Sequence, residues 1–257
     1  MPLPASVLGI PGVQPLEMQV VDLGDLGPRM RRVLLGAPAF GGGAGAGGGG
    51  GESFAYQPGQ DIMLVLGQAG DRPLSRRYSI RDIDRARGAL ELNVVVHGTG
   101  GPGARWAAGV QVGDAVNGVG PRGKITLAAA ADWHLFVGDE SAAPASLNML
   151  EAVPAGTPAW ALLEVTDAED ELPSRVPQAV RWLHRRAAPD GAASRLGQAL
   201  ANFTLPPGRG HLYIAGEVQM VAALREAALA RGLEPAQVAA KAYWGRGRPN
   251  APRGEPD

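Results

Sequence analysis

The sequence contains the stretch Arg76-Arg77-Tyr78-Ser79, followed about twenty residues later by His97-Gly98-Thr99-Gly100-Gly101-Pro102-Gly103. The first stretch places a guanidinium, a phenol ring and a hydroxyl on one short extended segment. The second is a glycine-rich turn that opens a predicted short helix at residues 103–108. A flat aromatic cofactor with a pyrophosphate needs these groups: a stacking ring, a hydroxyl for the isoalloxazine edge, a guanidinium and accessible backbone N–H groups. An Arg-Tyr-Ser strand alone is usually a solvated sheet edge, so the prediction rests on the order of the two stretches.

Six short β-rich segments occupy the first half of the chain, with turn signals such as Gln57-Pro58-Gly59-Gln60 between them. They cover residues 16–23, 29–35, 62–66, 76–80, 90–96 and 115–119. Short strands separated by turns predict a small closed or nearly closed antiparallel β-barrel, which the short helix caps. Residues 41–51 are all Gly or Ala, a composition that predicts a disordered loop inserted into the barrel.

The pattern changes after Gly120-Pro121-Arg122-Gly123, where strands begin to alternate with helices. Predicted strands cover residues 134–137, 160–165, 180–183, 212–215 and 241–244, and predicted helices cover residues 144–153, 195–203 and 217–231. Such alternation is typical of a parallel α/β sheet with helices on both faces. We therefore expect two domains, a β-barrel at residues 1–127 and an α/β domain at residues 128–257.

Composition excludes several classes of function. The chain has 257 residues, a net charge of −1 and no cysteine. The near-neutral charge disfavours nucleic acid as a partner, and the lack of cysteine excludes disulfides, thiol catalysis and Cys-ligated metal centres. The four histidines are widely spaced, so no metal site is expected. No apolar run is long enough to span a membrane, and the N-terminus lacks a secretory pattern, so we expect a cytoplasmic protein without membrane insertion.

The two-domain pattern resembles the ferredoxin-reductase-like flavoenzymes, and within them the siderophore-interacting protein family. Members of this family are FAD-containing, NAD(P)H-dependent ferric-siderophore reductases. The resemblance runs in order from about residue 16 to residue 247 and leaves out the tails and the Gly/Ala segment. Six motifs carry it: Arg76-Arg77-Tyr78-Ser79-Ile80-Arg81, His97-Gly98 through Gly101-Pro102 to Trp106-Ala107, Gly120-Pro121-Arg122-Gly123, Gly138-Asp139-Glu140-Ser141-Ala142-Ala143-Pro144-Ala145, Ala215-Gly216-Glu217 and Tyr243-Trp244-Gly245-Arg246-Gly247.

The resemblance implies that the first domain binds FAD. Arg76 would clamp the pyrophosphate, Tyr78 would stack on the isoalloxazine, and Ser79 would hydrogen-bond the reactive nitrogen of the flavin. Ala104 stands where the family often has a hydroxyl residue, which puts one phosphate hydrogen bond of roughly 1–2 kcal/mol in doubt. The alternative for Arg76 and Tyr78 is a cross-strand pair on a sheet edge. The glycine-rich turn would contribute the remaining contacts, from His97, Gly98, Gly101, Pro102, Gly103 and Ala104.

The second domain is expected to bind NADPH or NADH at the carboxyl ends of its strands. Asp139 and Ser141 follow one predicted strand and precede a helix, and Gly216 and Glu217 form a second strand-to-helix turn. Ser141 is the candidate partner of the nicotinamide. Asp139 and its neighbour Glu140 could equally serve only as caps of the helix.

Two further pairs of residues belong to the predicted nucleotide and flavin contacts. Arg185 and Arg186 could pair with the 2′-phosphate of NADPH, or lie at an ordinary solvated strand end. Tyr243 and Trp244 are expected beside the flavin, with a core role as the alternative for Trp244.

The expected substrate is a ferric siderophore, often an anion, which a cluster of cations near the domain cleft would attract. Surface salt bridges are the alternative role for these cations, Arg122, Lys124, Lys241 and Arg246. The implied reaction moves a hydride from NAD(P)H to FAD and then single electrons to ferric iron, which leaves the chelate as Fe(II). Two other functions stay open: a general NAD(P)H:flavin or ferric reductase, and a non-catalytic siderophore-binding module. We expect a monomer.

Overall fold

The computed structural model describes residues 13–41, 54–69, 72–96, 101–187 and 195–245. The chain divides into two compact units, Met1–Lys124 and Ile125–Asp257, slightly before the predicted boundary. His97, Gly98, Arg246 and the predicted Gly/Ala loop, apart from Gly41, lie outside the described residues.

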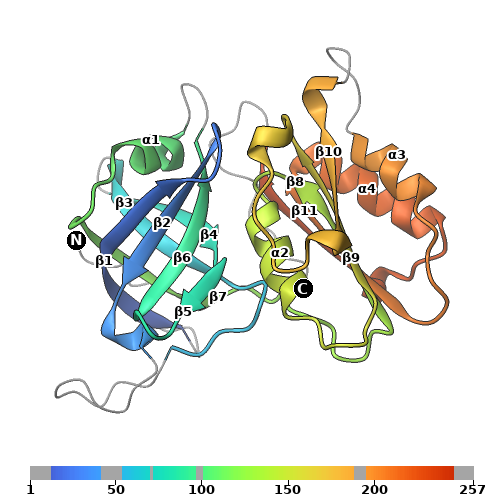
Figure 1. The fold of residues 1–257 in the computed structure, drawn as a ribbon, viewed down its shortest axis with the longest axis horizontal. Helices are drawn as coiled ribbons and strands as arrows, with labels where there is room; N and C mark the ends of the chain where they lie inside the picture. The colour runs from blue at the N-terminus through green and yellow to red at the C-terminus, as the bar shows by residue number, and fades with distance from the viewer. Residues whose placement is uncertain (1–12, 42–53, 70–71, 97–100, 188–194, 246–257) are drawn as a thin grey trace. The chain divides into compact units, whose positions relative to one another are not determined.

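The first unit is a curled antiparallel sheet of seven strands in the order β4-β3-β7-β1-β2-β6-β5 (Figure 1). The antiparallel β domain is therefore confirmed, but the predicted number of strands is wrong by one. The extra strand, β5, spans only Asp82–Asp84 and is too short and polar to give an alternating pattern. The other elements are β1 (Gln14–Asp25), β2 (Met30–Gly36), β3 (Asp61–Ala69), β4 (Arg72–Ser79), β6 (Ala89–Val95), α1 (Pro102–Gly109) and β7 (Ala115–Arg122).

Alternating side chains fill the interior of this sheet. In β1, for example, Leu16, Met18 and Val20 are buried while the residues between them are exposed, as a strand with one face on a core requires. The sheet curls until its two edge strands, β4 and β5, come together at Ile80 and Arg81, the two residues that join them in the chain. Ile80 N donates to the Gln60 carbonyl next to β3, and Arg81 N donates to the Glu91 carbonyl in β6, both at 3.0 Å.

The second unit is a parallel sheet of five strands in the order β10-β9-β8-β11-β12, as the alternation of strands and helices predicts. All seven residues of the central strand β8 are buried, because helices and neighbouring strands cover it on every side. Figure 1 shows α2 on one face of the sheet and α3 with α4 on the other. The elements are β8 (Trp133–Asp139), α2 (Ala143–Glu151), β9 (Ala159–Val165), β10 (Val180–His184), α3 (Arg195–Asn202), β11 (Gly210–Glu217), α4 (Val218–Ala230) and β12 (Val238–Trp244).

The strand order of this sheet determines where a ligand can bind. The chain proceeds from β8 to β9 and β10 on one side, and from β11 to β12 on the other. Nucleotide ligands bind at the carboxyl ends of the strands where the order reverses, which here is between β8 and β11. The predicted residues Asp139 and Gly216 lie at the carboxyl ends of these two strands. Within the described part of the chain, no helix combines the length and apolar character that a membrane span requires.

Candidate functional site

Three of the predicted cofactor residues lie together in the first unit. Arg76 and Tyr78 are two residues apart in β4, so both side chains project from the same face of the strand. The Tyr78 ring packs against Trp106 of α1, with ring centroids 5.8 Å apart. A Cβ placed on Gly103 would lie 2.6 Å from Tyr78 Oη and 3.7 Å from Arg76 Cγ. The glycine at this position therefore lets the helix approach both side chains closely.

The Tyr78 hydroxyl is a buried polar group without a hydrogen-bond partner among the described residues. Burial raises the pKa of this phenol far above its ordinary value, and the nearby Arg76 charge opposes that rise only in part. The hydroxyl therefore stays protonated and has a donor to satisfy, whereas buried polar groups in folded proteins are nearly always paired. A polar atom of a bound cofactor is the kind of partner that this site lacks.

The guanidinium of Arg76 also remains available. Its Nη1 donates to the carbonyl of Ser75 at 2.7 Å, and no carboxylate pairs with it among the described residues. Its neighbour Arg77 is different, because Nε and Nη2 bind the two carboxylate oxygens of Asp61 at 2.8 and 2.6 Å. The structure thus separates two adjacent arginines into one that stabilises the sheet and one that is positioned to bind an anion. Sequence reasoning did not find the Arg77–Asp61 pair.

The other residues predicted to bind FAD that the structure describes lie at the end of β4 and at the start of α1. Ser79 ends β4 and, by strand alternation, lies on the face opposite Tyr78. Gly101 precedes α1 as its N-cap without a side-chain hydrogen bond, and Pro102 begins the helix. The first-turn N–H groups, including that of Ala104, therefore have no cap from the N-cap side chain and can donate hydrogen bonds to an anion.

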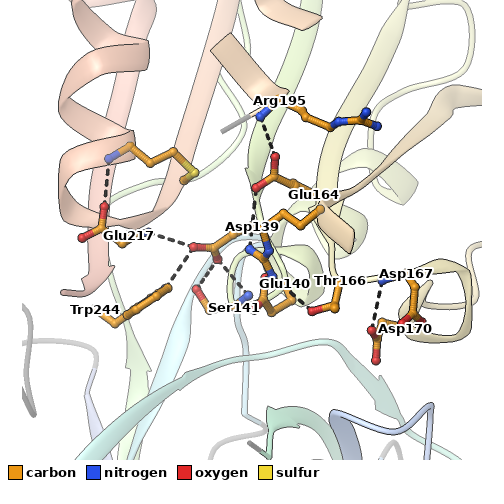
Figure 2. A network of polar contacts seen from close by, with 12 residues as sticks. Asp139, Glu140, Ser141, Glu164, Thr166, Asp167, Asp170, Arg195, Glu217 and Trp244 are labelled. Carbon is orange, nitrogen blue, oxygen red and sulfur yellow. Dashed lines mark hydrogen bonds and ion pairs between the residues drawn. The ribbon is translucent and has the colours of Figure 1, made fainter. Parts of the chain in front are cut away.

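In the second unit, Asp139 connects three segments at the carboxyl end of the sheet (Figure 2). Its Oδ1 accepts hydrogen bonds from Ser141 N at 2.9 Å and from Ser141 Oγ at 2.6 Å. Its Oδ2 accepts from Glu217 N at 2.8 Å and from Trp244 Nε1 at 2.9 Å. Burial, and next the charge of Glu140, raise the pKa of this carboxyl, and the hydrogen bonds from the Ser141 side chain, Trp244 and the Glu217 backbone oppose that rise. The structure therefore brings together Asp139, Ser141, Glu217 and Trp244.

The carboxyl end of β11 fits tightly against this carboxylate. Gly216 has a φ of +134°, and a Cβ on it would lie 2.5 Å from Asp139 Oδ2. Only glycine satisfies both the backbone conformation and the space. The next residue, Glu217, accepts hydrogen bonds from Gln219 N and Met220 N at 2.8 and 3.0 Å, so it caps α4. Asp139, by contrast, joins turns of different strands, which is more than the capping role left open from the sequence.

Arg185 and Arg186 both carry ion pairs. Arg185 Nη2 lies 2.5 Å from Glu140 Oε2, and its Nη1 lies 3.6 Å from Glu164 Oε2. Arg186, with 73% of its side chain exposed, lies 3.3 Å from Asp167. Sequence reasoning did not single out Glu164, although an acidic residue inside the apolar strand sequence AWALLEV is a signal that could have found it.

Three of the cations predicted to bind the substrate lie among the described residues. In the first unit, Arg122 Nη1 contacts the Met63 sulfur at 3.3 Å, and Lys124 is exposed. In the second unit, Lys241 Nζ lies 5.8 Å from the centre of the Tyr243 ring, a cation–π contact. No group of three potential metal-ligating side chains is present among the described residues.

The sequence and the fold of this chain are similar to those of known reductases and siderophore-related proteins. The chain is 34% identical over 186 residues to the ferric vibriobactin reductase ViuB of Vibrio cholerae, which covers 69% of this chain and 66% of that protein. It is 30% identical to the NADPH-dependent ferric-chelate reductase of Escherichia coli, covering 70% of each. The crystal structure of a siderophore utilization protein from T. fusca superposes with a TM-score of 0.75 at 28% identity, covering 93% of this chain and 96% of that one.

Two family profiles cover most of the described chain. Residues 19–125 match the siderophore-interacting FAD-binding domain, and residues 131–247 match the siderophore-interacting protein profile. The alignment with curated mycobacterial relatives, at 36% identity, spans 56% of their length. The matches follow the two units in order, and the chain belongs to the siderophore-interacting protein family.

Proposed function

We propose that the protein is an NAD(P)H-dependent oxidoreductase that holds FAD and reduces the iron of a ferric siderophore. The observation that carries this proposal is the buried, unpartnered Tyr78 hydroxyl, which lies beside Arg76 and Gly103 in the unit that matches an FAD-binding domain. The reductase names of the Vibrio cholerae and Escherichia coli relatives support the reaction class.

The residues of the first unit would bind and orient the cofactor. Arg76 would neutralise phosphate charge, the N–H groups at the start of α1 would bind the same anion, and Tyr78 would pack on the ring system and donate its hydroxyl proton. When bound, FAD supplies the conversion of a two-electron hydride donor into one-electron chemistry. Ser79 stays a proposed flavin contact from the opposite face of β4.

The residues of the second unit would hold the nicotinamide nucleotide. The turns after β8 and β11 meet at Asp139, which fixes Ser141, the start of α4 and the indole of Trp244 in one arrangement. Gly216 stays a proposed nucleotide contact through its backbone, and its missing side chain lets it pack directly on the Asp139 carboxylate. Because no acid, base or nucleophile is needed, the task of these residues is to orient the nucleotide and exclude water.

The proposed substrate is a chelate of ferric iron with oxygen ligands. Such ligands hold Fe(III) much better than Fe(II), so reduction releases the metal. Arg122, Lys124, Lys241 and Arg246 are the proposed cations for an anionic chelate. A pool of NAD(P)H is required, and the cytoplasm is the compartment that we expect to supply it.

The test begins with the absorption spectrum of the purified protein. We expect a yellow protein whose flavin band is bleached anaerobically by NADH or NADPH and restored by a ferric siderophore. Restoration at equal rates by ferric citrate would instead indicate a general ferric reductase. A colourless protein that binds a siderophore and fails to take up added FAD would contradict the proposal and favour a binding module.

A further inference from the structure

The charges at the carboxyl ends of β9 and β10 bear on which nicotinamide nucleotide is used, and this inference rests on the function proposed above. NADPH differs from NADH by a phosphate on the adenosine 2′-oxygen, which carries nearly two negative charges at neutral pH. Dinucleotide-binding domains recognise the group on the adenosine 2′-oxygen near the strand that neighbours the first strand-to-helix turn. At that place an acidic residue accepts a hydrogen bond from the free 2′-hydroxyl of NADH, whereas an arginine pairs with the 2′-phosphate of NADPH. In this chain the first turn follows β8, and the neighbouring strand on that side is β9.

Arg185 is the candidate arginine for that position, but carboxylates already surround it. Its guanidinium lies 2.5 Å from Glu140, in the turn after β8, and 3.6 Å from Glu164, in β9. Its Nη2 also approaches Thr166 Oγ1 at 3.5 Å. Burial alone would lower the pKa of Arg185, but the charges of Glu140, Glu164 and Asp139 outweigh it and leave that pKa raised. The positive charge of Arg185 is thus balanced by carboxylates of the protein itself.

The Glu164 carboxylate is held in place from a second direction. Glu164 is 2% exposed, and its Oε1 accepts a hydrogen bond from Arg195 N at 2.7 Å, at the start of α3. A carboxylate fixed by both Arg185 and a helix terminus cannot turn away to make room for a phosphate. Figure 2 shows Glu164 and Arg195 next to the Asp139 network.

The adjoining segment is also acidic. Arg186 is paired with Asp167, and four of the five residues from 167 to 171 are Asp or Glu. Of these, Asp167 accepts a hydrogen bond from Glu169 N, and Glu171 pairs with His184 at 2.8 Å. Each guanidinium therefore faces at least one carboxylate, and the excess charge in this region is negative. A dianionic group would be repelled here, whereas a hydroxyl would find acceptors.

We propose that this protein prefers NADH to NADPH, because Glu140 and Glu164 occupy Arg185, the arginine that would otherwise receive the 2′-phosphate. Glu140 is the specificity-determining residue that can be changed with least disturbance, because it lies in a turn and is partly exposed. The proposal separates this chain from its relative in Escherichia coli, which is named an NADPH-dependent enzyme.

The test uses the full-length, FAD-loaded protein and follows bleaching of the flavin band under anaerobic stopped flow, so that no siderophore is needed. We expect the second-order rate constant to be at least about tenfold higher for NADH than for NADPH. Glu140→Gln frees Arg185 from one partner and should shift this ratio toward NADPH by about five- to tenfold, through tighter NADPH binding. Asp22→Asn removes the same charge from a pair in the first unit and should leave the ratio unchanged.

Ionic strength supplies a measurement that needs no variant. Raising the salt concentration screens the acidic groups, so the preference for NADH in the wild-type protein should shrink. A wild-type preference for NADPH would overturn the inference while leaving the reductase function intact. An unchanged ratio in Glu140→Gln would overturn the role of Glu140. Failure of both nucleotides to bleach bound FAD would overturn the proposed function itself, and the inference with it.

Discussion

At the scale of single residues, Gly103 is the position where one added methyl group has the clearest consequence. Its missing Cβ creates the space in which the Tyr78 hydroxyl lies. Alanine is normally favoured over glycine inside a helix by about 0.5–1 kcal/mol. Helix propensity alone would therefore favour alanine at this position, whereas the close contact with Tyr78 requires glycine.

We predict that Gly103→Ala weakens FAD binding by about tenfold or more, because the new methyl group displaces Tyr78. The matched control is Gly109→Ala in the same helix, where no atom lies within 4 Å of the added Cβ. The ratio of FAD to protein after gel filtration, and titration of the apoprotein with FAD, measure the effect. Equal FAD affinity in Gly103→Ala and the wild type would refute the role assigned to this contact.

His211 gives a prediction about pH. Burial, followed by the charges of His134 and Arg209, lowers the pKa of His211 from 6.5 to about 4. Between these two pH values the unfolded chain binds more protons than the folded one, so the free energy of unfolding rises with pH across this window. Acidification from pH 6.5 to 4 should thus remove about 1–2 kcal/mol through this residue, after allowance for its partial exposure.

His211→Phe should reduce that pH dependence, and urea unfolding at pH 4.5 and pH 7 measures it. His184→Gln, whose half-buried ring pairs with Glu171, serves as the comparison. If His211→Phe retains the full wild-type difference between the two pH values, the neutral state assigned to this ring is wrong.

At the scale of elements, the Asp139 carboxylate connects the ends of three strands. It accepts bonds from the turn after β8, from the start of α4 and from the last residue of β12. Glu217 and Trp244 are 78 and 105 residues away from Asp139 in sequence, so one buried carboxylate fixes the geometry of both strand-to-helix turns. Such a network is strong when complete and costly when one donor is left unpaired.

We predict that Asp139→Asn lowers the free energy of unfolding by about 1–3 kcal/mol for each buried donor that faces the new amide group. Trp244→Phe should cost less, because it removes only one donor. The double variant should cost less than the sum of the two single ones. Trp182→Phe, on β10 of the same sheet, should combine additively with Asp139→Asn. An additive result for the Asp139 and Trp244 pair in urea unfolding would show that their hydrogen bond is energetically unimportant.

At the scale of the whole molecule, each unit has its own apolar interior. One is formed around Leu35, Ile62 and Leu90, and the other around Leu135, Leu162 and Ile214. Because each of these two clusters draws its residues from one unit alone, we expect the two units to respond separately to ligands.

We predict two calorimetric transitions, of which saturating FAD raises only one. A ligand present at a thousand times its Kd stabilises its own unit by about 4 kcal/mol. In Arg76→Ala the same FAD concentration should produce a much smaller rise, because the phosphate clamp is lost. A single transition that FAD shifts as a whole would show that the two units unfold together.

Structural features that depend on a recurring local pattern could be predicted from the sequence. Alternation and turn residues identified six strands of the first unit and all five strands of the second. The motif around Tyr78 also predicted that Arg76 and Tyr78 lie on one strand, where their spacing of two places both on the same face. Pairings between distant residues were not predictable. The partners Arg77 with Asp61, and Arg185 with Glu140 and Glu164, depend on which strands become neighbours, and no local pattern encodes that.

The position of β8 in the middle of its sheet has a consequence for synthesis on the ribosome. Its partners are β9, which follows soon after, and β11, which begins at Gly210. The backbone edge of β8 that will pair with β11 therefore has no partner until more than 70 further codons have been translated. A nascent chain stalled in that interval would present an open strand edge to other chains, a hazard for aggregation. Truncations between β10 and β11 should accordingly accumulate in inclusion bodies, however well the first unit folds.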